Sequence, residues 1–141
     1  MNVQGGCVAS IRQHIRIAAD PDTVWDIIKV PESQPDWFPG IIKATYDPET
    51  RIRVITVSMG VDMPEEILTV DPTLRRFAYK ITAPLYKFHY GIIDVIEIAP
   101  NDTLCIYSTT AEPEVLALLI GAGTMGALEK IKEIAEQKVK K

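Results

Sequence analysis

The feature that most constrains the fold is a run of strand-like segments joined by short connections. Six such segments are recognisable, at residues 41–46, 52–58, 65–70, 76–82, 88–98 and 103–110. Turn-forming sequences such as Asp47-Pro48 and Asp71-Pro72 separate them. Parallel neighbours need a crossover of a dozen or more residues, whereas antiparallel neighbours need only a turn. The sequence therefore predicts an antiparallel meander.

The segment before this run contains one strand and two short helices. Residues 8–17 alternate between apolar and polar side chains, which predicts a half-buried strand. Asp20 followed by Pro21 is typical of a helix start, because proline suits the first helical position. Three prolines between residues 31 and 39 then limit residues 32–38 to one or two helical turns.

A stretch of helix formers follows Pro113 and predicts a long C-terminal helix. Its apolar positions fall within one helical sector: Leu116, Ile120, Thr124, Ala127, Leu128, Ile131, Ile134 and Ala135. The whole order predicts an α+β fold, in which a seven-stranded curved antiparallel sheet wraps around this helix and two short helices follow the first strand. We expect residues 1–7 to form a tail and residues 8–141 a single domain, with a pocket between sheet and helix.

Charge and composition exclude several classes of function. The 141 residues carry 15 Lys+Arg and 19 Asp+Glu, a net charge of −4. This balance, without a basic and aromatic stripe, argues against a nucleic-acid partner. No apolar run approaches the roughly 20 residues of a membrane span, and the N-terminus lacks the features of a secretion signal. We therefore expect a cytoplasmic protein.

The two cysteines, Cys7 and Cys105, are far apart and have no metal-binding spacing. They predict no disulfide framework and no metal site, and no motif indicates a cofactor. A buried structural thiol is the expected role of Cys105.

Several local patterns, taken in their order, resemble the START/Bet v 1-like superfamily in its bacterial polyketide cyclase/dehydrase branch. They are Ile15-x-Ile17-x-Ala19-x-Pro21-x-x-x-Trp25, Trp37-Phe38-Pro39-Gly40, Glu65-Glu66-Ile67 before Val70-Asp71, and Arg76-Phe77-Ala78-Tyr79-x-Ile81. The resemblance covers nearly the whole chain and implies a helix-grip fold with a deep hydrophobic cavity. It does not imply one activity, because the superfamily includes carriers, receptors and aromatase/cyclases.

A more distant similarity is to the plant hormone receptors of this superfamily. It implies that residues 59–64 and 83–87 occupy the places of a gate loop and a latch loop. Pro39 stands where those receptors have a ligand-binding lysine, and their latch signature is missing. The similarity therefore does not extend to the hormone.

The segment 88–98 supplies the leading polar candidate. Phe88, Tyr90, Ile92 and Asp94 share one strand face, which we expect to line the cavity. Asp94 would then lie on an apolar wall, where a carboxylate takes a proton or finds a partner. The alternative is a bulge at Gly91 that sends Asp94 to solvent.

Two tyrosines and one glutamate complete the polar set. Tyr79 and Tyr90 would orient a ligand through their hydroxyls or, with Asp94, act in catalysis. The receptor similarity implies a water-coordinating role for Glu65, with Glu66 outward; a reversed register exchanges the two. The predicted ligand-binding residues are Trp37, Glu65, Ile67, Phe77, Tyr79, Ile81, Phe88, Tyr90, Ile92, Asp94, Thr124 and Leu128.

The two histidines, His14 and His89, lie on charged strand faces and are expected in solvent. No Ser-His-Asp or Cys-His arrangement is indicated, which argues against hydrolase chemistry.

The start of the C-terminal helix is apolar around its full circumference, and Gly121, Gly123 and Gly126 follow. A surface helix is usually amphipathic. The segment is therefore interpreted as a mobile cover over the cavity, as a partner interface that would form a homodimer, or as a helix start buried by the short helices.

The sequence favours binding of a small hydrophobic ligand, such as a lipid, an aromatic polyketide or an isoprenoid, in the internal cavity. The alternatives are a cyclase or dehydratase that uses a cavity carboxylate and a tyrosine, and a protein-interaction module.

Overall fold

The computed structural model describes residues 7–140, so the predicted tail lies outside the described residues except for Cys7. The elements, in order, are β1 (Ala9–Ile17), α1 (Pro21–Ile28), the 3₁₀ helix η1 (Pro31–Ser33), α2 (Gln34–Trp37), β2 (Ile41–Asp47), β3 (Ile52–Val57), β4 (Asp62–Asp71), β5 (Arg76–Ile81), β6 (Phe88–Ala99), β7 (Asp102–Glu112) and α3 (Glu114–Val139).

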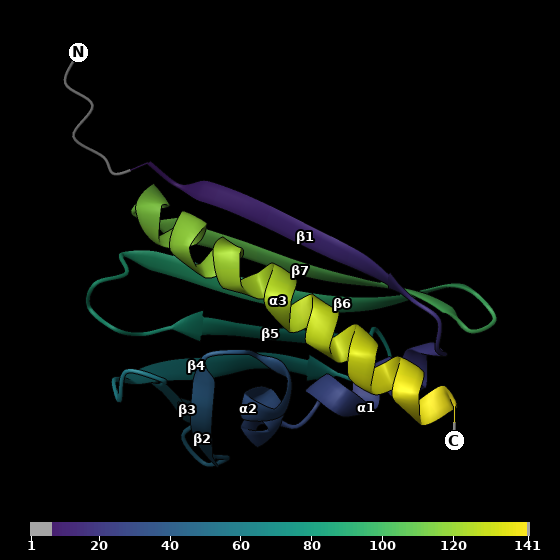
Figure 1. The fold of residues 1–141 in the computed structure, drawn as a ribbon. Helices are drawn as coiled ribbons and strands as arrows, with labels where there is room; N and C mark the ends of the chain where they lie inside the picture. Colours follow the sequence, from purple (N-terminus) through teal and green to yellow (C-terminus); the bar gives the residue numbers. More distant parts are fainter. Residues whose placement is uncertain (1–6, 141) are drawn as a thin grey trace.

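All seven strands form one antiparallel sheet in the order β1-β7-β6-β5-β4-β3-β2. The long helix α3 runs diagonally across one face of this sheet, and α1 and α2 lie on the same side (Figure 1). The predicted helix-grip architecture is confirmed. None of the helices within residues 7–140 is long and apolar enough to cross a membrane.

The start of α1 follows the predicted capping chemistry. The Asp20 carboxylate accepts hydrogen bonds from the Thr23 backbone N–H and from the Thr23 hydroxyl, both at 2.9 Å. These bonds stabilise the charged form and lower the pKa of Asp20. The cap sets the direction of α1, which buries Val24, Trp25 and Ile28 against the sheet.

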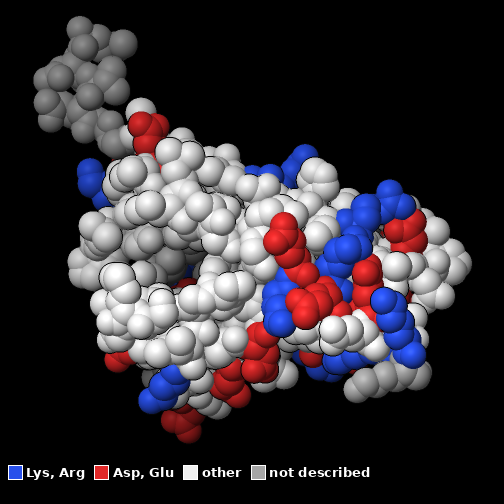
Figure 2. Space-filling view, viewed as in Figure 1, with Lys and Arg blue, Asp and Glu red and all other residues white. Residues whose placement is uncertain are grey.

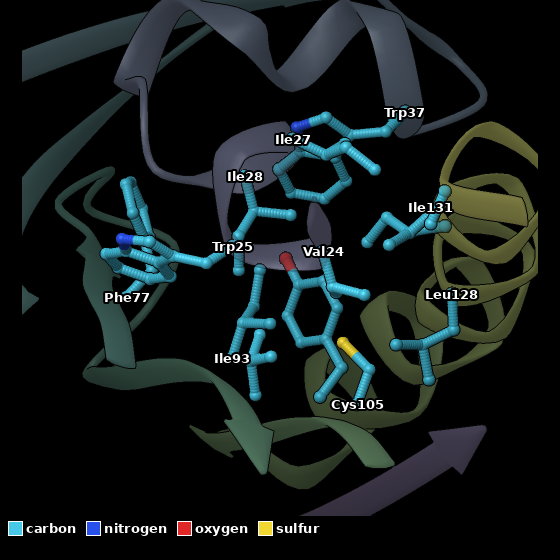
Figure 3. Close-up of a cluster of buried hydrophobic side chains, with 14 of the residues drawn as sticks. Val24, Trp25, Ile27, Ile28, Trp37, Phe77, Ile93, Cys105, Leu128 and Ile131 are labelled. Carbon is cyan, nitrogen blue, oxygen red and sulfur yellow. The ribbon is translucent and has the colours of Figure 1, made fainter. Parts of the chain in front are cut away.

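The main hydrophobic core lies between α1, the second half of α3 and the concave face of the sheet. Figure 3 shows Val24 and Ile28 of α1, Leu128 and Ile131 of α3, and Ile93 of β6 converging there. Cys105 is buried in the same cluster as predicted, and burial raises the pKa of its thiol to about 12. This half of the molecule is filled by side chains.

The first half of α3 is a regular helix rather than an irregular cover. It is unbroken from Glu114 to Val139, with Leu116 and Ala117 buried. Its glycines allow close approach: a Cβ on Gly121 would lie 2.9 Å from Cγ2 of Ile11 in β1. A Cβ on Gly123 would lie 3.2 Å from the Phe38 ring. The glycines therefore bring α3 close to β1 and to the loop before β2.

Two substitutions within α3 separate close packing from helix propensity. Gly126→Ala meets only Pro39, at 3.8 Å, so it should raise the free energy of unfolding by about 1 kcal/mol through helix propensity. Gly121→Ala gains the same propensity but clashes with Ile11, and should lower that free energy by about 1 kcal/mol. Urea unfolding of both variants measures the difference. Equal stabilisation by the two alanines would contradict the close contact.

Candidate functional site

A cavity of about 190 Å³ lies beneath the first half of α3. Its walls come from α2 and the following loop, from strands β2 to β5, from the β5–β6 loop and from α3. The lining residues, in chain order, are Gln34, Phe38, Pro39, Gly40, Ile41, Ile55, Val57, Met63, Glu65, Tyr79, Ile81, Tyr86, Leu119, Ile120 and Gly123. In Figure 2 it opens as a hollow among mostly uncharged side chains, while charged side chains gather on the other half of this face. The cavity is thus an apolar space with few polar groups.

A buried ion pair forms one end of this space. Arg53 of β3 and Glu65 of β4 occupy directly opposite positions of the ladder, and each is only 1% exposed. Arg53 Nε donates to Glu65 Oε1 at 2.7 Å, and Nη2 lies 2.7 Å from the same oxygen without a well-aligned hydrogen bond. Glu65 borders the cavity, and Arg53 lies behind it.

The guanidinium of Arg53 is held on three sides. Nη1 donates to the Pro31 carbonyl at 3.0 Å, and the guanidinium carbon lies 5.4 Å and 5.1 Å from the ring centroids of Phe77 and Tyr79. Burial raises the pKa of Glu65, and the charge of Arg53 opposes this rise. Because an unpaired guanidinium in the interior is very unfavourable, we infer that both groups stay charged and that the pair carries no net charge.

Two tyrosine hydroxyls form a hydrogen bond with each other at the cavity wall. Tyr79 and Tyr107 are buried and hydrogen-bonded through their hydroxyls. Burial is the main cause that raises the pKa of both phenols above the ordinary value. These hydroxyls are therefore neutral, and one of the two donates its proton to the other.

Gln34 is the polar group without a partner at the cavity wall. It begins α2, is 1% exposed and borders the cavity, yet its Oε1 is buried with no hydrogen-bond partner among the described residues. An unpaired buried amide oxygen is destabilising by about 1–3 kcal/mol. Such a group marks a place where a bound molecule would supply the missing bond.

Only part of the predicted site is assembled at this cavity. Glu65, Tyr79 and Ile81 border it. Five further predicted residues are buried but do not line it: Trp37, Ile67, Phe77, Thr124 and Leu128. The expected orientation of the neighbouring glutamates is confirmed, because Glu65 points inward and Glu66 lies 3.2 Å from Lys80 Nζ at the surface.

The predicted orientation of β6 is wrong, because the face expected to line the cavity is the outer face. Phe88, Tyr90, Ile92 and Asp94 lie on the outer face, whereas His89, Gly91, Ile93 and Val95 are buried on the inner face. Asp94 is paired with Arg76, whose Nε donates to Asp94 Oδ1 at 2.7 Å. Asp94 and Tyr90 therefore do not reach the cavity. Phe88 and Tyr90 line a separate outer hollow instead.

No bulge at Gly91 causes this orientation, since the register of β6 with β7 is continuous from Phe88 to Glu97. Gly91 is opposite Tyr79 on β5, and a Cβ on Gly91 would lie 2.7 Å from the Tyr79 ring. The Tyr79 side chain thus occupies the space that a larger residue would need. Both faces of β6 contain isoleucine, so alternation alone does not distinguish them.

Sequence reasoning missed Gln34, Arg53 and the cavity face of β3. A signal was present for β3: Arg53, Ile55 and Val57 alternate onto one face, and the charged member is opposite Glu65. No comparable local pattern indicates that Gln34 is buried. One residue from each segment predicted as gate or latch lines the cavity: Met63, which lies in β4, and Tyr86.

His89 is buried rather than in solvent, whereas His14 is exposed as predicted. The His89 Nδ1 accepts a hydrogen bond from the Ile81 backbone N–H at 2.9 Å. This bond extends the contact of β5 and β6 beyond their last ladder pair, Tyr79 and Gly91. Desolvation lowers the pKa of His89 to about 4, so the ring is neutral.

Comparison with known proteins shows the family. The family model described as "Polyketide cyclase / dehydrase and lipid transport" matches residues 8–139. The chain belongs to this family. No curated protein gives a significant sequence match. Within residues 7–140 no cluster of three or more His, Cys, Asp or Glu side chains is arranged to hold a metal ion.

Several solved structures share the fold. XoxI from Bacillus cereus is 23% identical with a TM-score of 0.82, and the match covers 89% of this chain and 94% of that one. The ZhuI aromatase/cyclase from Streptomyces sp. R1128 is 17% identical, with a TM-score of 0.79 and coverage of 94% and 96%. Truncated norcoclaurine synthase from Thalictrum flavum is 17% identical, with a TM-score of 0.75 and coverage of 100% and 99%. At these identities the likeness establishes the fold alone.

The burial of His89 predicts a defined loss of stability in acid. The unfolded chain binds a proton near pH 6.5 while the folded chain does not, so stability falls as the pH decreases from 6.5 to about 4. This contribution amounts to about 3 kcal/mol. His89→Asn, which keeps an acceptor for the Ile81 N–H, should remove it, and His14→Gln should not. Urea unfolding between pH 4 and 7 measures all three proteins; identical pH profiles would contradict the buried neutral histidine.

Proposed function

We propose that this protein binds one small, mainly apolar molecule in the cavity beneath the first half of α3. The observation that carries the proposal is the division of the interior: the second half of α3 covers a filled core, and the first half covers an open space. Most of the lining is apolar, and Gln34, Glu65 and the tyrosines supply a few polar groups. This combination is typical of ligand sites.

The size of the cavity limits the ligand. A cavity of about 150 Å³ accommodates benzene, and drug-sized ligands occupy about 300 Å³ or more. At about 190 Å³ the space suits a single substituted ring or a short branched chain. A longer lipid or a polycyclic polyketide would extend through the opening beside Tyr86 and Leu119.

The arrangement favours binding over the cyclase or dehydratase alternative. The proposed acid, Asp94, is paired with Arg76 on the outer face, and the hydroxyl of Tyr79 is already bonded to Tyr107. Neither group is placed to move a proton on a ligand in the cavity. The homodimer expected through the start of α3 stays a prediction, with Val115, Leu118 and Leu119 as its exposed apolar side chains.

A tryptophan placed in the cavity tests the proposal. Val57→Trp directs an indole into the cavity, and should weaken the binding of 4-fluorotoluene at least tenfold because the ring occupies the same space. Ile92→Trp adds the same side chain to the outer face and should leave affinity unchanged. Titration followed by ¹⁹F NMR measures both. Wild-type affinity in Val57→Trp would place the ligand elsewhere.

A further inference from the structure

We propose that the cavity selects a neutral ligand with a hydroxyl group, an alcohol or a phenol, whose proton is accepted by the amide oxygen of Gln34. The proposal rests on the ligand-binding function above and adds the chemical class of the ligand. The observation behind it is the unpaired amide oxygen of Gln34 at the cavity wall.

Among the described residues that line the cavity, Gln34 Oε1 is the one buried side-chain polar atom without a hydrogen-bond partner. The hydroxyls of Tyr79 and Tyr107 are bonded to each other, and Arg53 donates to Glu65 Oε1 and to Pro31. Both contacts of Glu65 with Arg53 go to its Oε1. A carboxylate oxygen only accepts, whereas an amide both donates and accepts.

A hydroxyl matches the Gln34 oxygen better than a carbonyl or an ether does. It would donate its proton to Gln34 Oε1, the buried oxygen without a partner, which a carbonyl or an ether cannot do. A carbonyl oxygen only accepts, and would face the Glu65 carboxylate without a proton between them. The site therefore distinguishes ligands that carry a donor from those that do not.

The balanced charges beside the cavity disfavour binding of a charged ligand. Arg53 and Glu65 neutralise each other in a space where both are 1% exposed. A bound carboxylate or ammonium would add an uncompensated charge to this interior, which is strongly unfavourable. The ligand head is therefore neutral, and the apolar remainder lies against Ile55, Ile120 and Met63.

Matched ring compounds test the inference on the intact protein by ¹⁹F NMR titration. 4-Fluorophenol should bind about tenfold more tightly than 4-fluorotoluene, which corresponds to one net hydrogen bond. 4-Fluorobenzaldehyde should bind no more tightly than 4-fluorotoluene, and 4-fluorobenzoate should bind more weakly than either. Equal binding of the phenol and the toluene would overturn the hydroxyl preference while leaving the cavity function intact. Tight binding of the benzoate would overturn the neutral-ligand inference, and no binding of any ring would overturn both proposals.

The variant Gln34→Met tests whether Gln34 is responsible for the preference for a hydroxyl group. The substitution preserves length and removes the amide oxygen, so the preference for 4-fluorophenol over 4-fluorotoluene should fall to threefold or less. Glu65 is not substituted, because its loss would leave Arg53 buried without a partner. Gln13→Met, at a half-buried position on β1 away from the cavity, is the matched control and should keep the full preference. An unchanged preference in Gln34→Met would overturn the assignment.

Discussion

The buried ion pair of Arg53 and Glu65 organises the region around the cavity. Two opposite charges can occupy an interior only when they are matched closely, because desolvation of either one alone is very unfavourable. Their positions directly across the β3–β4 ladder hold the register of this hairpin, since a one-residue slip would turn one of them to the other face. The bond from Arg53 to Pro31 extends the constraint to the short helices, and the Phe77 and Tyr79 rings flank the guanidinium.

The buried ion pair accounts for the difference between the filled end and the open end of the interior. At one end, α1 and the second half of α3 pack apolar side chains against the sheet without a large space. At the other end, the space beneath the first half of α3 is left open, and its wall contains the Glu65 carboxylate and the Gln34 amide. Close-packed cores leave few voids larger than a water molecule. A cavity of about 190 Å³ beside the unpaired oxygen of Gln34 therefore supports the proposed ligand site.

The same polar groups define what chemistry the cavity supports. The tyrosine pair is neutral and internally bonded, the ion pair has no net charge, and the acidic side chain Asp94 is on the opposite face of the sheet. In the proposed function, these groups would bind and orient a neutral molecule rather than exchange protons with it. Membership of a family described by polyketide cyclisation, dehydration and lipid transport fits an apolar cavity whose polar groups vary in role.

Local patterns in the sequence determined the order of elements, the antiparallel pairing and the long C-terminal helix, because turn signals and alternation act within a few residues. The inward orientation of Glu65 was implied by the receptor similarity, while alternation left the reversed register open. The family resemblance supplied the helix-grip fold and the cavity. Only the tertiary structure decided which face of β6 is buried, since Ile92 and Ile93 make both faces apolar and the space taken by Tyr79 and Tyr107 resolves the choice. It also decided that His89 and Gln34 are buried. Burial of a polar side chain depends on which other elements pack over it, and the periodicity of its own segment does not show this.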